Sequence, residues 1–152
     1  ISSAFNAAEK LTDLADQDAQ AVSALKDEQE RQELLALLGI REGERVSPSL
    51  RAQVRRLEEQ QKRRAKRVSS DTLLRSVAQV QTVLRDALTV ALSAQAPLVN
   101  EHLREPLEAF CTRRSAQQLL EDVQAVELTL RRLRTNANAR LALEALMSRF
   151  VY

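Results

Sequence analysis

Apolar residues recur at helical spacing in the first 38 residues. Their steps of three, four or seven residues place them on one face of a helix: Phe5, Ala8, Leu11, Ala15, Val22 and Leu25. The charged stretch Lys26–Glu33 interrupts this face, and we expect it to lie in solvent. Gly39 is placed to cap the helix in a left-handed conformation. We therefore predict a long helix over Ser2–Leu38, followed by a polar loop over Ile40–Val46.

A second long helix is predicted over Pro48–Leu92. Ser47 can accept a hydrogen bond from a free amide, and a proline in the first turn loses no hydrogen bond. The first half is polar and basic. The pattern does not decide whether the helix is continuous or kinked near Ser69-Ser70. Ala96-Pro97 should end the helix, because proline disfavours helical geometry in its predecessor. The second half carries a core-facing stripe at 4-3-4-3-4 spacing: Leu73, Val77, Val80, Leu84, Ala87 and Ala91.

Two further helical segments follow. Asn100 can cap a short helix that runs to about Thr112, and Pro106 should bend this helix or divide it into two pieces. Ser115 and Gln118 then form a capping-box pair at the start of a longer helix. That helix has a stripe at 4-3-4-3 spacing: Leu119, Val123, Val126, Leu130 and Leu133.

The last two predicted helices carry apolar residues on more than one face. Leu120 and Leu128 lie off the stripe of the first of these helices. The final helix, for which Asn138 is the expected cap, is apolar over more than half of its circumference. A helix of this kind either lies at the centre of a core or contacts another chain, and we favour the second explanation. The residues predicted to form a protein interface are Leu128, Leu141, Met147 and Phe150.

Composition supports an all-α fold. The 152 residues include no Trp, one Tyr and three Phe, so Leu, Ala and Val must form the core. Two Gly and three Pro are far fewer turn residues than a β-protein of this length needs. We predict a helical bundle of about five to six helices that forms a single domain over residues 1–152. Because the chain starts at Ile1 within a helical pattern, we expect it to be a fragment of a longer protein.

The charge is nearly balanced, with 23 basic and 21 acidic residues, which argues against a general nucleic-acid binder. One basic run nevertheless stands out within residues 51–67. It could contact phosphates or an acidic partner, or it could be a solvated surface paired with the acidic residues 27–33, which we favour. A nucleic-acid-binding module is the alternative function, although without interleaved aromatics it would not stack on bases. The candidate contact residues are Arg55, Arg56, Lys62, Arg63, Arg64, Lys66 and Arg67.

No residue pattern indicates an enzyme. Two glycines cannot build a phosphate-binding loop. His102 has no evident catalytic partner, and its spacing to Cys111 fits no metal site, so we expect a structural cysteine. The acidic pairs Glu58-Glu59 and Glu121-Asp122 are interpreted as solvated ion pairs. We expect no catalytic residue, cofactor or metal, and no apolar run is long enough to span a membrane.

Several segments resemble one bacterial family when taken in order. Arg131–Met147 resembles the closing segment of the DNA polymerase III delta prime subunit, in which an Asn-x-Asn break precedes a Leu-Ala-Leu-Glu-Ala-Leu type helix. Ala4–Glu9, Leu57–Arg67 and Leu98–Asn100 resemble segments of the actinobacterial form of that subunit. The similarity covers nearly the whole chain, and the order of the segments is more specific than any one of them.

The resemblance implies a collar domain of a clamp loader. In that family, C-terminal helical domains from five subunits pack into a ring above their ATPase modules. The implied partners are the delta and gamma/tau type subunits, and the implied setting is DNA replication in the cytoplasm. The delta prime subunit does not turn over ATP, and its ATPase-like module lies N-terminal to the collar. No catalytic or cofactor-binding residue is therefore carried over to this sequence.

Overall fold

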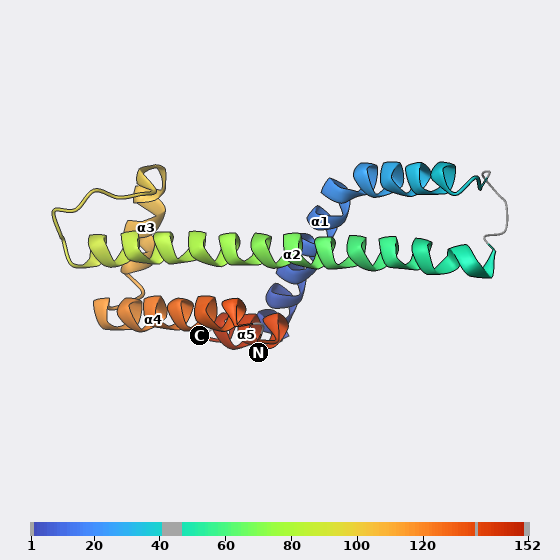
Figure 1. Cartoon of the computed structure of the whole chain (residues 1–152). Coiled ribbons are helices and arrows are strands. Elements are labelled where there is room, and N and C mark those ends of the chain that lie inside the picture. The colour runs from blue at the N-terminus through green and yellow to red at the C-terminus, as the bar shows by residue number, and fades with distance from the viewer. Residues whose placement is uncertain (1, 41–46, 136, 151–152) are drawn as a thin grey trace. The chain divides into compact units, whose positions relative to one another are not determined.

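The computed structural model of the chain describes residues 2–40, 47–135 and 137–150 (Figure 1). This described part contains five α-helices, one short 3-10 helix and no strand, so the predicted all-α class is confirmed. The chain divides into two compact units: unit 1 is Ile1–Thr12 with Leu73–Tyr152, and unit 2 is Asp13–Thr72. α1 (Ser2–Leu37) and α2 (Pro48–Ala91) each contribute residues to both units. The single domain expected over residues 1–152 stays a prediction.

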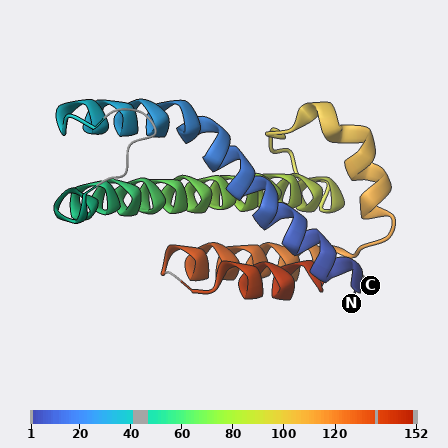
Figure 2. The ribbon, with the colours of Figure 1, turned by 90° about the vertical axis from the view of Figure 1, so that its right-hand side faces the viewer.

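Unit 2 is an antiparallel pair of helical segments, residues 13–37 of α1 and residues 48–72 of α2 (Figures 1 and 2). Its buried residues are small. Because the separation of two helices depends on the side chains at their contact, small residues permit a close approach. Such residues also bury little apolar area, so the hydrophobic contribution to this unit is modest. The buried set is Ala15, Ala19, Ser23, Val54 and Ser69.

The apolar repeat predicted for α1 is buried only in part in unit 2, where Ala15 is buried as predicted but Val22 and Leu25 are not. Val22 is 76% exposed and Leu25 is 81% exposed. The buried face instead runs through Ala15, Ala19 and Ser23, at steps of four. Ser23 can be buried because its hydroxyl donates to the Ala19 carbonyl at 2.9 Å. The prediction was wrong for Val22 and Leu25 because close helix contact selects small side chains over large apolar ones.

The boundaries between α1 and α2 follow the sequence signals. Gly39 has a φ of 70°, and the Ile40 amide donates to the Leu35 carbonyl at 2.9 Å, as expected for a left-handed glycine cap. The loop predicted over Ile40–Val46 lies, beyond Ile40, outside the described residues. α2 begins at Pro48 as predicted. It is a continuous helix to Ala91, through the Ser69-Ser70 position.

Unit 1 has a leucine-rich core. Besides parts of α1 and α2, it contains the 3-10 helix η1 (Glu101–Leu103), α3 (Arg104–Cys111), α4 (Ala116–Arg134) and α5 (Ala139–Met147). α4 lies beside residues 73–91 of α2 and packs against α5 (Figures 1 and 2). Most of both predicted stripes is buried, while Val80, Ala91 and Val123 are partly exposed. The buried members are Leu73, Val77, Leu84, Ala87, Leu119, Val126, Leu130 and Leu133.

The helix starts in unit 1 confirm three local predictions. The Gln118 amide donates to Ser115 Oγ at 3.2 Å while the Ser115 amide donates to Gln118 Oε1 at 2.9 Å, which completes the capping box of α4. Asn138 Oδ1 accepts from the Leu141 amide at 3.2 Å and caps α5. Pro106 lies in the first turn of α3, just after η1, so the segment is divided into two pieces.

Asn100 does not cap a helix with its side chain, contrary to prediction. Its Nδ2 donates instead to Asp86 at 2.8 Å, and the amides of Val99 and Asn100 donate to the same carboxylate at 3.0 and 2.7 Å. The Asp86 carboxylate is fully buried and therefore needs these donors. Burial alone would raise the pKa of Asp86, but the hydrogen bonds outweigh it and hold the pKa below its usual value.

α2 ends at Ala91, one residue before the predicted end at Leu92 and before the Ala96-Pro97 pair is reached. The Ala94 amide donates to the Thr89 carbonyl at 3.0 Å, and the Ser93 amide donates to Val90 at 2.9 Å. This is the bonding of a glycine-type cap, although Ser93 occupies the left-handed position with a φ of 50°. The sequence signal was weak because serine rarely adopts this conformation.

Replacing Ser93 with Gly should stabilise the chain. Glycine adopts a positive φ without the steric cost that Ser93 bears, so the free energy of unfolding should rise by about 0.5–1 kcal/mol. Urea unfolding followed by circular dichroism measures the change. Ser148→Gly is the matched control, because Ser148 has a φ of −59° and should gain nothing. Equal effects of the two substitutions would contradict the assignment of strain to Ser93.

Asp86 should make the stability of the chain sensitive to acid. Its pKa is depressed in the folded state, so its contribution is complete above the unfolded pKa of about 3.9 and is lost as pH falls through the folded value. The difference in unfolding free energy between the wild type and Asp86→Asn should therefore shrink below pH 4. Urea unfolding of both proteins between pH 7 and pH 3 measures it. A constant difference over this range would contradict the assignment.

Candidate functional site

The first candidate surface lies on α4 and α5 in unit 1. Leu128 is 44% exposed and Leu141 is 62% exposed, which suits residues that meet another chain. Leu120, on another exposed strip of α4, is 41% exposed. Met147 and Phe150 are half-buried. Two of the four predicted interface residues are thus available at the surface, and the other two also pack within the unit.

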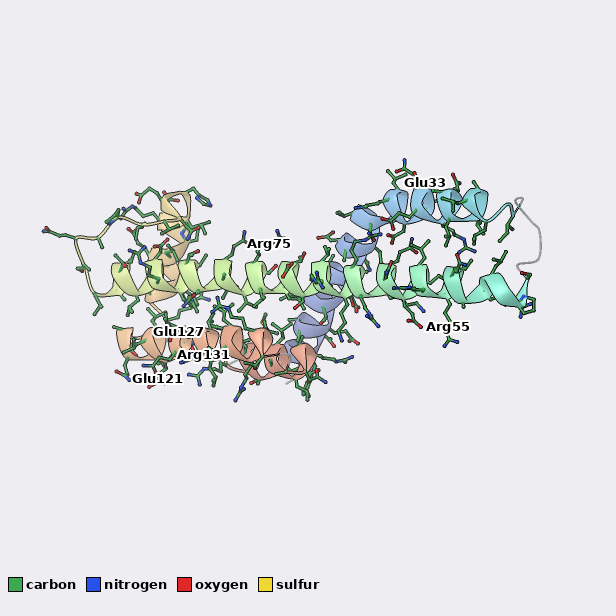
Figure 3. The ribbon with its side chains drawn as sticks, viewed as in Figure 1. Glu33, Arg55, Arg75, Glu121, Glu127 and Arg131 are labelled. Atoms are coloured by element: carbon green, nitrogen blue, oxygen red, sulfur yellow. The ribbon has the colours of Figure 1, made fainter. Side chains whose placement is uncertain are left out.

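Ion pairs lie next to each of the two exposed leucines. Glu127 and Arg131 form an ion pair of 3.8 Å next to Leu128, on the part of α4 labelled in Figure 3. Arg140, the neighbour of Leu141, pairs with Glu144 at 2.9 Å and with Glu9 at 3.2 Å. An apolar contact ringed by polar groups is the usual composition of a protein–protein interface.

Phe150 belongs to a cluster around Arg114. The Arg114 guanidinium lies 5.5 Å from the centre of the Phe150 ring and 5.7 Å from that of Phe110. It also donates to the Arg149 carbonyl at 3.2 Å and forms a short ion pair with Asp122. These contacts connect the residues after α5 to the start of α4 and the end of α3. Phe150 is therefore held within unit 1, and its part in an interface stays a prediction.

Asp122 is not a solvated acid, contrary to the interpretation of Glu121-Asp122. It is 1% exposed, and it contacts Arg114 together with Arg149, whose Nε lies 3.5 Å away. The sequence contained a signal for this site. Asp122 falls three residues after Leu119 and four before Val126, so it lies on the buried side of α4. A carboxylate in that position requires a cationic partner.

The second candidate surface is the basic run of α2, in unit 2. Arg64 forms short ion pairs with Asp27 and Glu30 of α1 and is therefore not free to contact a partner. The distance between Arg64 Nη2 and Glu30 Oε2 is 2.6 Å. Gln61 donates to the Asp27 carbonyl at 2.8 Å. Hydrogen bonding to Arg64 lowers the pKa of Glu30, and the same bonds raise the pKa of Arg64. The predicted pairing with residues 27–33 therefore holds for Arg64, and Asp27 and Glu30 are partly shielded from solvent.

The other six predicted contact residues are exposed and are called the basic face below. Arg55 makes an ion pair of 3.5 Å with Glu59 one turn away. The remaining five have no ion pair with another described residue closer than 4 Å. The basic face comprises Arg55, Arg56, Lys62, Arg63, Lys66 and Arg67.

His102 and Cys111 lie in different surroundings. His102 is exposed, whereas Cys111 is half-buried and donates its thiol proton to the Ala87 carbonyl at 3.2 Å. Burial raises the pKa of the Cys111 thiol. Among the described residues, no group of three or more His, Cys, Asp and Glu side chains is placed to hold a metal. None of the described helices is long and apolar enough to cross a membrane.

Comparison with known protein families identifies the chain. Residues 28–151 match the family described as DNA polymerase III, delta subunit, C terminal, and the chain belongs to this family. The match includes the end of α1 and all of α2, α3, α4 and α5. It confirms the DNA polymerase III part of the resemblance and supports a clamp-loader role. No curated protein and no solved structure matches the chain.

Replacing Asp122 with Asn should destabilise the chain strongly. The Arg114 side chain is only 13% exposed and would lose the charge that compensates its burial. The expected loss is about 2–4 kcal/mol of unfolding free energy, measured in urea. Glu121→Gln is the neighbouring control, because its 3.7 Å pair with Arg149 is half-exposed and should contribute under about 1 kcal/mol. Similar losses of unfolding free energy for both variants would show that the buried Asp122–Arg114 pair stabilises the chain no more than the exposed Glu121–Arg149 pair.

Proposed function

We propose that this chain is the collar domain of a delta prime subunit, a non-catalytic assembly module of a bacterial clamp loader. It packs against the delta and gamma/tau type subunits in the cytoplasm and so supports loading of the sliding clamp during replication. The observation that carries the proposal is the pair of exposed leucines, Leu128 and Leu141, on the terminal helices of a DNA polymerase III family domain.

The delta prime assignment is supported by the resemblance of Arg131–Met147 to the closing segment of that subunit. Two residues of this segment have clear structural roles. Leu133 is buried at the end of α4, and Asn138 caps α5. A break that both ends one helix and caps the next fixes how the two helices meet. A segment of this kind is suited to presenting a constant surface to a neighbouring subunit.

Charge introduced at the exposed leucines should prevent assembly. The variant Leu128→Glu with Leu141→Glu changes only side chains that already face solvent, so its helical circular dichroism should match the wild type. Pull-down with purified delta and gamma/tau type subunits should then lose at least about tenfold in affinity, because interface centres tolerate unpaired charge poorly. Met147 and Phe150 are less suitable targets, since changes there would also disturb the packing of unit 1.

The control adds the same charge elsewhere. Gln17→Glu with Gln29→Glu places two carboxylates on exposed positions of α1 that belong to unit 2, whereas Leu128 and Leu141 belong to unit 1. This variant should assemble like the wild type. Assembly that survives Leu128→Glu with Leu141→Glu would place the interface on another surface. Loss with both variants would show that net charge alone is responsible.

Reconstitution can assign the subunit. Mixtures of purified loader subunits that lack either delta prime or delta are supplemented with the chain, and complexes are sized by chromatography. The proposal expects incorporation only where delta prime is missing. Incorporation only where delta is missing would assign the chain to delta instead. The readout is assembly and not clamp loading.

A further inference from the structure

The basic face of unit 2 takes no part in the proposed collar interface. Its six side chains are all exposed, and among the residues that the structure describes only Arg55 has an acidic neighbour within ion-pair distance. Figure 3 shows Arg55 on the side of α2 that faces away from residues 13–37 of α1. A cluster of exposed cations with so few acidic partners is costly for the folded chain unless an anion binds it.

The basic face consists of two parallel rows along one helix. Arg56, Arg63 and Arg67 form one row at steps of seven and four, and Arg55, Lys62 and Lys66 form the other at the same steps. Each row spans 12 residues, and the 11 steps between its first and last residue make about 16 Å of helix at a rise of about 1.5 Å per residue. Along a duplex with about 3.4 Å per phosphate on each strand, that length accompanies about four to five phosphates.

Charge is segregated between the two helical segments of unit 2. Residues 48–72 of α2 have eight basic and three acidic residues, whereas residues 13–37 of α1 have two basic and seven acidic residues. The buried Val54 and the bonded Gln61 face α1, so the helical rotation puts the row Arg56, Arg63 and Arg67 on the opposite half of α2.

The acidic residues of α1 therefore do little to cancel the potential of this row. Packed helices are about 8–10 Å apart between their axes, and the far side of α2 adds to that distance. The separation exceeds the screening length of about 8 Å at physiological ionic strength. The acidic residue that reduces the positive charge of the row most directly is Glu59, a neighbour of Arg56 and Arg63 on α2 itself.

The composition of the face favours nucleic acid over an acidic protein. Protein interfaces have apolar or aromatic residues at their centre. No apolar side chain is exposed between Arg55 and Arg67, since Leu57 and Ala65 are both half-buried. Contacts to phosphates need only cations, and they carry no sequence information. The absence of aromatics in this stretch leaves no platform for base stacking.

We propose that the basic face binds the phosphate backbone of duplex DNA without sequence preference. The row Arg56, Arg63 and Arg67 makes the central contacts, and Arg55, Lys62 and Lys66 make the flanking ones. Arg64 is not among the DNA-contacting residues, because it is already paired with Asp27 and Glu30. The inference goes beyond assembly and does not rest on the delta prime assignment, because it concerns unit 2 alone.

Fluorescence anisotropy with a labelled primer–template duplex tests this proposal at salt concentrations from 50 to 200 mM. Six phosphate contacts should make affinity fall by about 10³-fold over this range, because log K falls by about 0.9 per contact for each unit of log salt. In the variant Arg56→Gln with Arg63→Gln and Arg67→Gln, the slope should decrease by about 2.7. The three side chains are exposed, so circular dichroism should show an unchanged fold.

The control removes three exposed charges from unit 1. Lys10→Gln with Arg113→Gln and Arg134→Gln changes the net charge by the same amount and should leave binding unchanged. No binding at 50 mM salt overturns the proposal, and so does an equal loss in both variants. Polyglutamate of matched charge serves as competitor. If it displaces the duplex as well as unlabelled duplex does, the face binds acidic protein and not DNA.

Discussion

Burial of one stripe of α4 is the constraint on which the candidate interface depends. Leu119, Val126 and Leu130 are nearly inaccessible to solvent, and α4 packs against α5. A rigid helix cannot bury opposite faces against one neighbour, so fixing this stripe fixes the rotation of α4. Leu128 must then point outward. Its exposure is a consequence of the core and not an independent choice.

Polar contacts reinforce the same arrangement. The buried Asp122 is on the core side of α4, where only Arg114 and Arg149 can compensate its charge. Because those arginines come from before α4 and after α5, one carboxylate positions both ends of the helical pair. Phe110 and Phe150 shield the guanidinium of Arg114. Asp86 acts similarly in the same unit, where it holds Val99 and Asn100 against the end of α2.

Unit 2 is stabilised in a different way. Its buried residues are mainly alanine and serine, so the apolar area removed from water is small. Arg64 connects the two helical segments through Asp27 and Glu30. Close packing of small residues leaves the long side chains of both segments outside the contact. This explains why Val22 and Leu25 on one segment, and the basic face on the other, are exposed.

Local chemistry in the sequence determined the helices and most of their ends. Gly39, the Ser115–Gln118 pair and Asn138 form caps through contacts between near neighbours, so they can be identified without a fold. The stripes of the second half of α2 and of α4 were also evident, because large apolar residues repeat at helical spacing. In the last two helices, helical spacing also placed apolar residues on more than one face, and this pattern led to the prediction of a protein interface.

Only the tertiary structure decided which face of α1 is buried. It also decided which arginine of the basic run forms ion pairs with α1, and which carboxylate is buried and needs a cationic partner. Ala15 and Ala19 are buried where α1 packs against α2. The sequence of α1 alone does not show which of its faces makes this contact. Arg64 differs from Arg63 only in the direction it points, toward Asp27 and Glu30 of a segment distant in sequence. Burial and charge pairing between distant segments are properties of the assembled chain. The sequence by itself determined the helices, and the packing determined which side chains remain available for function.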